Sequence, residues 1–299
     1  MVPPSRGAGL LLFCLLASLS AGAFASAAAL QRFQIVTGDD SALTRRIALD
    51  LHKRLVPVFA DDNVEKVDDG LPQRKVYVAI GPVALREAIM RKPEGVVIAA
   101  FTSAHVWRSV VAEVPRGRKS SVTAIFAEPA PSDQLRLIQL LYKRPVRVSA
   151  IVSADTAFLK PFLQGAAEIE DYHQGDDING ALKRIAKAEA LLAMPDREVY
   201  NTENIRNILL STYRHNQGVI GFSSDMVKTG ALASTYSEIE DINAQIAETA
   251  ATFIATNELA GPQFPRYFRT IVNAGVARSL KVVLDDNVTK FGRRPPGVK

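Results

Sequence analysis

Short apolar runs rich in β-branched residues alternate along the chain with longer segments of helical periodicity. The apolar runs lie at 33–38, 75–81, 95–101, 121–128, 146–153, 188–194, 218–224 and 268–273. Most of them are continuously apolar, which is typical of strands buried on both faces of a parallel sheet. Helical periodicity predicts helices at 41–56, 82–90, 131–142, 156–169, 178–188, 202–215 and 238–255. The alternation therefore predicts an α/β fold with parallel sheets and right-handed crossovers.

The spacing of these elements also predicts two lobes. A proline-rich segment, residues 126–134, follows the fourth apolar run, and a second strand–helix series starts at Val146. Segments 228–241 and 268–280 are two further places where the chain is expected to cross between lobes. We therefore expect an N-terminal lobe of residues 26–130 with about 236–268, and a C-terminal lobe of residues 131–235 with about 269–299.

The N-terminus predicts export. Residues 1–25 contain one arginine, then the apolar stretch LLLFCLLASLSAGAF, and "AFA" precedes Ser26 in the form of a cleavage site. We interpret this segment as a cleaved signal peptide and expect a periplasmic protein. The only cysteine, Cys14, lies inside it, so the mature chain has no thiol for a disulfide or a metal site. No later stretch is apolar enough to span a bilayer.

Composition and motifs argue against several classes of function. The net charge is +5, but the basic residues are scattered, so no nucleic-acid surface is expected. The sequence has no glycine-rich phosphate loop and no G-x-S-x-G motif, and no two of its four histidines are four residues apart. We therefore predict no catalytic residues, no metal site and no cofactor, and a protein that is not an enzyme.

Small and polar residues follow several predicted strands. Parallel α/β sheets bind ligands beyond the carboxyl ends of their strands, where free helix N–H groups favour anions. Taken one at a time, Ser, Thr and Asp at such junctions are ordinary helix caps. Taken together, anion donors in the first half and Asp196 in the second half would suit a zwitterion such as an amino acid. The predicted ligand-binding residues are Gly81, Pro82, Phe101, Thr102, Ser103, Glu128, Asp196, Ser223, Ser224 and Asp225.

An ordered series of motifs resembles a known family. The segments "PSDQLRLIQLLYKRPVRVSAIVS", "AEALLAMPDREVY", "GVIGFSSDMVKTGALAST" and "IVNAGVARSL" are similar to those of ABC-transporter substrate-binding proteins of the tryptophan/tyrosine-binding type. The resemblance covers about residues 75–284. It implies the type I periplasmic binding-protein fold, in which two Rossmann-like lobes joined by three crossovers close on a small ligand. It also implies that Asp196 receives an ammonium or other donor, and that Gly81, Pro82, Ser223 and Ser224 lie in ligand loops.

The resulting prediction is a monomeric periplasmic protein that captures a small molecule, an amino acid or an aromatic or hydrophobic metabolite. The expected partners are that ligand and the membrane permease of an ABC transporter, with no nucleic acid. Two alternatives stay open at this point: a periplasmic sensory or regulatory domain of the same fold, and an exported α/β enzyme. Asp196 likewise has two interpretations, a ligand carboxylate or a turn residue.

Overall fold

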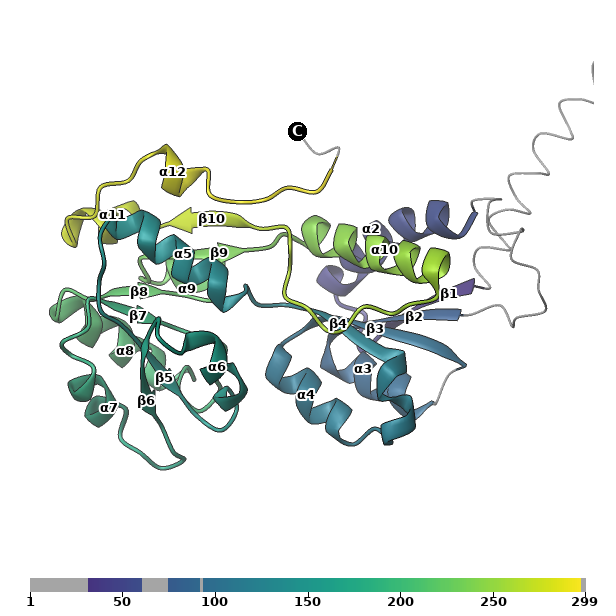
Figure 1. Cartoon of the computed structure of the whole chain (residues 1–299), viewed down its shortest axis with the longest axis horizontal. Coiled ribbons are helices and arrows are strands. Elements are labelled where there is room, and N and C mark those ends of the chain that lie inside the picture. The colour runs from purple at the N-terminus through teal and green to yellow at the C-terminus, as the bar shows by residue number, and fades with distance from the viewer. Residues whose placement is uncertain (1–31, 61–74, 92–93, 297–299) are drawn as a thin grey trace, which may run out of the picture.

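The chain forms two α/β lobes that lie side by side (Figure 1). The computed structural model describes residues 32–60, 75–91 and 94–296, so the predicted signal peptide lies outside the described residues. One sheet has four strands in the order β1-β2-β3-β4, and the other has six in the order β10-β9-β8-β7-β5-β6. The predicted fold class, two Rossmann-like lobes with largely parallel sheets, is confirmed.

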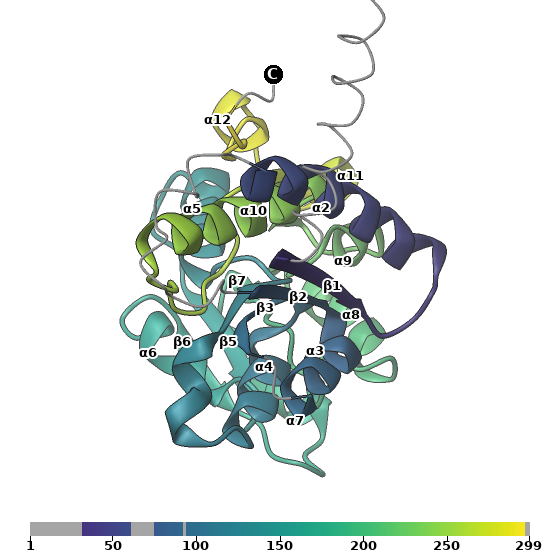
Figure 2. The ribbon, with the colours of Figure 1, turned by 90° about the vertical axis from the view of Figure 1, so that its right-hand side faces the viewer.

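The first lobe has an all-parallel sheet covered by helices on both faces (Figure 2). Helices α2 and α10 bury one face through Leu51, Leu55 and Ile246, and α3 and α4 bury the other through Leu85 and Trp107. Apolar strands with two covered faces explain the continuous apolar runs of the sequence. The elements are β1 (Phe33–Thr37), α2 (Ala42–Ala60), β2 (Lys75–Ile80), α3 (Gly81–Met90), β3 (Gly95–Thr102), α4 (Ala104–Ala112), η2 (Arg116–Ser121), β4 (Val122–Phe126) and α10 (Ile239–Thr256).

The second lobe repeats this arrangement around the longer sheet. Helices α5, α11 and α12 contribute to the core on one face, and α7, α8 and α9 to the core on the other. The elements are α5 (Pro131–Tyr142), β5 (Val148–Val152), η3 (Ala157–Leu159), α6 (Lys160–Leu163), β6 (Glu168–Asp171), α7 (Ile178–Arg184), β7 (Ala190–Leu192), α8 (Asn204–Arg214), β8 (Gly218–Ile220), α9 (Ser224–Lys228), β9 (Ala233–Tyr236), β10 (Arg269–Val272), α11 (Ala274–Ser279) and α12 (Asp286–Thr289).

Among the local differences from the sequence-based prediction, three concern β10, the segment 156–169 and α4. A parallel arrangement was expected, but strand β10 runs antiparallel to β9 at one edge of the second sheet. The helix predicted over 156–169 is wrong: the segment holds η3, α6 and the start of edge strand β6, whose half-exposed and charged residues hide the strand pattern. Helix α4 was not predicted, since Val106, Trp107, Val110 and Val111 are residues that strands also favour.

Three connections between the lobes lie together. The chain crosses at 127–130, at 237–238 and at 257–268, between elements that belong to different sheets. The third pairs in the manner of a strand with the end of β4, where the first begins: Phe126 N–H donates to Gln263 O at 3.0 Å, and Gln263 N–H donates to Ala124 O at 2.9 Å. The second and third meet where Ser237 Oγ donates to Tyr267 O at 2.6 Å. We therefore propose the lobe limits that the sequence predicted. Residues 239–256 pack on the first sheet, and residues 269–289 belong to the second lobe.

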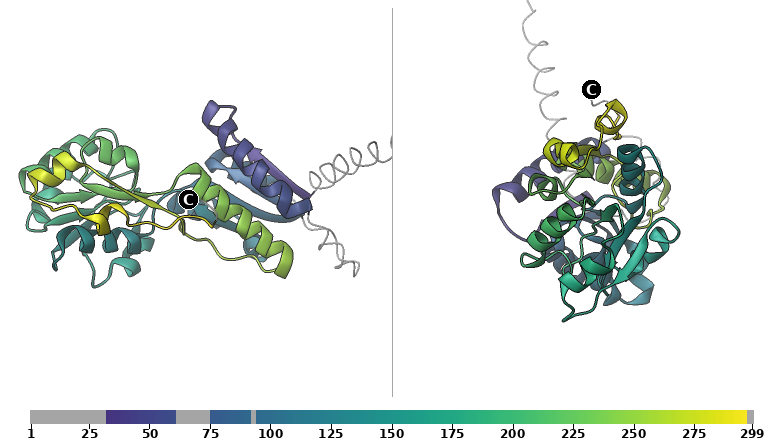
Figure 3. Two further views of the ribbon diagram at one scale, coloured as in Figure 1. Left: turned by 90° about the horizontal axis from the view of Figure 1, so that it is seen from above. Right: turned by 90° about the vertical axis from the view of Figure 1, so that its left-hand side faces the viewer.

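The C-terminal segment returns along the third connection. After α12 the chain runs from the second lobe toward the first (Figure 3). Phe268 and Arg293 exchange two backbone hydrogen bonds of 2.9 Å, and Thr270 Oγ1 donates to Phe291 O at 2.7 Å. The rings of Phe268 and Phe291 also make an edge-on contact, with centroids 5.2 Å apart. This segment therefore reinforces the third connection from outside the two sheets.

Gln134, in the first turn of α5, joins three segments of the second lobe. Its side-chain amide donates to Gly221 O and to Ser234 Oγ, the latter at 3.2 Å. Its Oε1 accepts from the backbone N–H and the hydroxyl of Thr235 at 2.9 and 3.1 Å. The residue is almost fully buried, so the end of the first connection is fixed to β9 and to the loop after β8.

We expect Gln134→Met to lower the free energy of unfolding by about 2 kcal/mol, because it leaves buried backbone groups such as Thr235 N–H without their partner. Urea unfolding followed by circular dichroism measures this loss. Gln139→Met, at an exposed position of the same helix, is the control and should change stability by less than about 0.5 kcal/mol. Equal losses in the two variants would contradict the bridging role of Gln134.

Candidate ligand-binding site

The carboxyl ends of the strands in both lobes lie next to the connections. The first connection leaves the end of β4 and enters α5 of the second lobe, and the second leaves the end of β9 and enters α10 of the first lobe. Since β1–β4 are mutually parallel and β5–β9 are mutually parallel, the ends of all these strands lie at the two edges that face each other. Open α/β sheets bind ligands at such edges.

A cavity lies between the second lobe and the connections at this place. Its lining comes from the first connection, the start of α5, η3, the end of β7, the loops after β7 and β8, and the third connection. Most of the lining is apolar, and Glu128 and Gln134 are its polar side chains. In this structure it has room for about one water molecule, so a larger ligand requires the cavity walls to move apart. The lining residues are Glu128, Pro129, Pro131, Gln134, Leu159, Leu192, Ala193, Met194, Pro195, Phe222 and Phe264.

Glu128 is the titratable group of this cavity. The side chain is only 5% exposed. Its Oε1 accepts a hydrogen bond from the backbone N–H of Ala104, the first residue of α4, at 2.7 Å. Its Oε2 has no hydrogen-bond partner among the described residues. Burial raises the pKa of the carboxyl to about 7, against the opposing effect of the backbone N–H groups of Ala104 and of Glu128 itself.

Phe101 and Thr102 end β3 beside this carboxyl, and Ser103 follows them. Phe101 has a φ of 54°, an unusual conformation for a bulky residue, and lies at a break in the pairing of β3 with β4. Thr102 is buried, and its hydroxyl donates to Ala100 O at 3.3 Å. Ser103 has the N-cap position of α4 but makes no capping bond; its hydroxyl lies 3.1 Å from His105 Nδ1. Glu128 caps this helix in its place.

Gly81 and Pro82 start α3 at the end of β2, where the sequence placed them. Gly81 has a φ of 83°, which a glycine adopts without strain, and a side chain at this position would meet no neighbouring atom. Pro82 fits the first turn of the helix, and the helix N-terminus has no side-chain cap. These two residues therefore lie at an open helix N-terminus at the same edge of the sheet as Ser103.

Asp196 is a buried carboxylate with many partners in its own lobe. It accepts from the backbone N–H and the hydroxyl of Ser153, both at 2.9 Å, and from the hydroxyl of Thr156. The backbone N–H groups of Glu198 and Val199 donate to it at 3.1 and 3.2 Å. It is 2% exposed and joins the loop after β5 to the loop after β7. Contact of Asp196 with a ligand stays a prediction, and these bonds favour the turn interpretation.

Ser223, Ser224 and Asp225 follow β8 and begin helix α9. The hydroxyl of Ser223 accepts from the backbone N–H of Met226 at 3.2 Å, an ordinary N-cap. Asp225 is exposed and pairs with Lys228 at 2.8 Å. The cavity residue of this loop is Phe222, which precedes them and was not among the predicted site residues. A ligand role for the three predicted residues stays a prediction.

The two lobes also make contact beside the cavity. The guanidinium of Arg108, in α4, lies 4.6 Å from the ring centroid of Phe158, in η3. Phe126, at the end of β4, and Phe264, of the third connection, pack edge-on with ring centroids 5.2 Å apart. Burial lowers the pKa of His105, and the charges of Asp155 and Arg197 from the second lobe also act on it. Sequence reasoning missed these residues because their partners lie far away in the chain.

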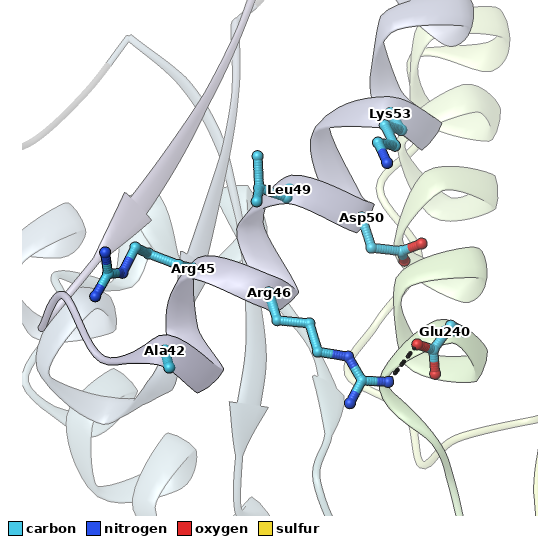
Figure 4. Close-up of a pocket in the computed structure, with 7 residues that line it drawn as sticks. All are labelled: Ala42, Arg45, Arg46, Leu49, Asp50, Lys53 and Glu240. Atoms are coloured by element: carbon cyan, nitrogen blue, oxygen red, sulfur yellow. Dashed lines mark hydrogen bonds and ion pairs between the residues drawn. The ribbon is translucent and has the colours of Figure 1, made fainter.

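A second hollow lies on the outside of the first lobe, between α2 and the start of α10 (Figure 4). An ion pair between Arg46 Nη2 and Glu240 Oε1, 2.7 Å long, spans it, and its other members are largely exposed. It shares no residue with the cavity between the lobes. The lining residues are Ala42, Arg45, Arg46, Leu49, Asp50, Lys53 and Glu240.

No helix among the described residues is both long enough and apolar enough to cross a membrane. No group of three or more His, Cys, Asp or Glu side chains among them is arranged to hold a metal ion.

Solved structures resemble the chain over most of its length. No protein-family model and no curated protein matches it. A ligand-free, open substrate-binding protein with adhesive properties from Clostridium difficile matches with a TM-score of 0.61 at 12% identity, over 86% of this chain and 97% of that one. An ABC domain from Streptococcus pneumonia in complex with L-Trp matches with a TM-score of 0.52 at 14% identity, over 87% and 98%.

The chain has the type I periplasmic binding-protein fold. The topology agrees with this assignment, since two α/β sheets are joined by three adjacent connections. A conserved domain protein from Vibrio cholerae matches as well, with a TM-score of 0.51 at 15% identity, over 86% of this chain and 96% of that one. At these identities the likeness concerns the fold, and L-Trp is the ligand of the Streptococcus protein.

Proposed function

We propose that the chain is a periplasmic solute-binding protein, exported by its N-terminal signal peptide, that captures a small molecule between its lobes. The observation that carries this proposal is the cavity at the facing strand ends, where a buried carboxyl with one unpartnered oxygen is surrounded by apolar side chains. Pockets with apolar walls and a few placed polar groups are typical of small-molecule sites. The fold shared with substrate-binding proteins supports the same conclusion.

The ligand is proposed to bind when the lobes separate and to be enclosed when they close. Three adjacent connections act as the hinge, and the third is hydrogen-bonded to the second and to the end of β4, where the first begins. Closure then follows from the greater number of contacts that the ligand makes in the closed state. Of the predicted site residues, Glu128 lines the cavity. We propose that Phe101 and Ser103 contact the ligand when the lobes close, and that Gly81 and Pro82 meet an anionic group.

A thermal-shift screen of the mature protein, Ser26 onward, tests this function. The panel contains amino acids, small carboxylates, amines and aromatic metabolites, and the protein is first stripped of ligand by unfolding and refolding. A ligand at a hundredfold excess over its dissociation constant adds about 2.7 kcal/mol, which raises the melting temperature by a few degrees. Small-angle X-ray scattering should then show a smaller radius of gyration with the ligand. Folded protein that responds to no compound would contradict the proposal.

We further propose that the bound ligand is delivered to the permease of an ABC transporter by the monomeric protein. Uptake of the identified ligand by cells with and without the chain measures this step. Transport predicts that uptake at low ligand concentration falls strongly without the chain. Unchanged uptake, with ligand binding intact, would instead favour the sensory alternative.

A further inference from the structure

The unpartnered oxygen of Glu128 carries an inference about the chemistry of the ligand. Among the buried side-chain atoms of the described residues that lack a hydrogen-bond partner, Glu128 Oε2 is the only carboxylate oxygen. A buried acceptor without a donor costs free energy, and a buried charge without a partner costs more. The other oxygen is held by Ala104 N–H, so the orientation of the carboxyl is fixed.

No cation of the protein neutralises this carboxyl. None of the ion pairs among the described residues includes Glu128. His105 supplies no positive charge near neutral pH, because burial lowers its pKa. Besides burial, the influences on the pKa of Glu128 are two backbone N–H groups. A positive charge at Oε2 therefore has to come from outside the chain.

The surroundings also determine what else the ligand contains. Phe222 and Phe264 line the cavity, with Leu159 and Met194, and Phe264 is held edge-on by Phe126. Aromatic faces attract cations, and apolar walls favour an apolar body. An anionic group is disfavoured here, because Glu128 already occupies the first N–H of α4.

We propose that Glu128 is the cation-recognition residue of the cavity, and that the ligand is a small amine whose ammonium group donates to Oε2 while its apolar body packs on Phe222 and Phe264. This inference rests on the proposed function and narrows it. It differs from recognition of a zwitterion by Asp196, whose oxygens are already occupied by donors of its own lobe. Glu128 thus has two roles, capping α4 through one oxygen and binding the ligand through the other.

The test compares matched probes on three proteins. The cationic probes are benzylamine, phenethylamine and tryptamine; the matched neutral probes are the corresponding alcohols, and the anionic probe is 3-phenylpropionate. Binding is measured by isothermal titration calorimetry with the parent protein, Glu128→Gln and Glu113→Gln. In Glu128→Gln the new side-chain amide oxygen can still accept from Ala104 N–H, so the cap is retained without the charge. Glu113 is exposed at the other end of α4 and serves as the control.

We expect at least one amine to bind the parent and Glu113→Gln equally, and to bind Glu128→Gln at least tenfold more weakly. Its affinity for the parent should increase from pH 6 to pH 8, as the carboxyl ionises. The neutral alcohols should bind weakly and to the same extent in all three proteins. Circular dichroism and unfolding of each variant show that it is folded.

Two results would overturn the inference. The first is that no amine binds, or that the same amine binds the parent and Glu128→Gln equally. The second is that 3-phenylpropionate binds more tightly than phenethylamine, because its carboxylate would then have found a donor in the cavity. In either case a neutral or anionic ligand from the wider screen would leave the proposed solute-binding function intact. Glu128 would then be a helix cap whose second oxygen is hydrated.

Discussion

Replacing Asp196 by alanine is expected to lower the free energy of unfolding by about 4 kcal/mol, the largest effect predicted for a single side chain of this protein. The substitution removes an acceptor that serves five donors, from Ser153, Thr156, Glu198 and Val199. Several of these donors are buried, so water does not readily replace the lost partner. The loops after β5 and β7 would lose their common anchor.

Urea unfolding measures this loss, and two variants show where it comes from. Asp196→Asn keeps one acceptor oxygen and should lose about half as much stability as Asp196→Ala. Asp225→Ala removes an exposed carboxylate and should change stability by less than about 0.5 kcal/mol. A loss below about 1 kcal/mol for Asp196→Ala, with ligand binding abolished, would reverse the interpretation and place this carboxylate on the ligand.

For Asp196, the sequence predicted the position of the residue in the fold but not its hydrogen-bond partners. The apolar run that ends at Met194 predicted a strand with an acidic residue just beyond it, and the structure has β7 followed by that loop. The partners of Asp196 lie about 40 residues earlier, at Ser153 and Thr156, and no local pattern links them. The sequence around a carboxylate at a strand end is the same whether its oxygens bind a ligand or accept hydrogen bonds from another loop.

The fold was predictable for a physical reason: strands buried on both faces of a parallel sheet need continuous apolar runs, and these are visible locally. The pattern failed where an element lacks two buried faces. Edge strand β6 carries Glu168, Glu170 and Asp171, and β10 joins the other edge in the opposite direction. Helix α4 was missed because its buried side uses Trp107, Val110 and Val111.

The candidate site was predictable only in part, because it is assembled from the whole chain. Its cavity combines the first connection, the loops after β7 and β8, and Phe264 of the third connection. The strand ends could be named from sequence, and of the predicted residues Glu128 lines the cavity, whereas ligand contact by Gly81, Phe101 and Ser103 stays a prediction. Whether the two lobes bring a particular pair together depends on packing between distant segments, which explains why Phe222 and Phe264 were missed.

Replacing Glu128 by glutamine is expected to change how stability depends on pH. The pKa of this carboxyl is about 7 in the folded protein and 4.5 when unperturbed, and burial is the main cause. Below pH 4.5 the group is protonated in both the folded and the unfolded state, so its ionisation does not change the free energy of unfolding. Between pH 4.5 and 7 the unfolded chain has lost the proton that the folded chain keeps, so stability falls as pH rises. Above pH 7 the fall is complete, at about 3 kcal/mol.

The parent protein should therefore lose about 2–3 kcal/mol more than Glu128→Gln between pH 5 and pH 8, and the variant should be the more stable of the two at pH 8. Urea unfolding at four pH values measures both curves, and Glu113→Gln should follow the parent. An amine that binds at Oε2 should restore the stability of the parent at pH 8, because an ammonium group compensates the buried charge, and it should do little for the variant. Parallel curves for the parent and Glu128→Gln would mean that water already reaches this carboxyl and that it ionises as an exposed group does.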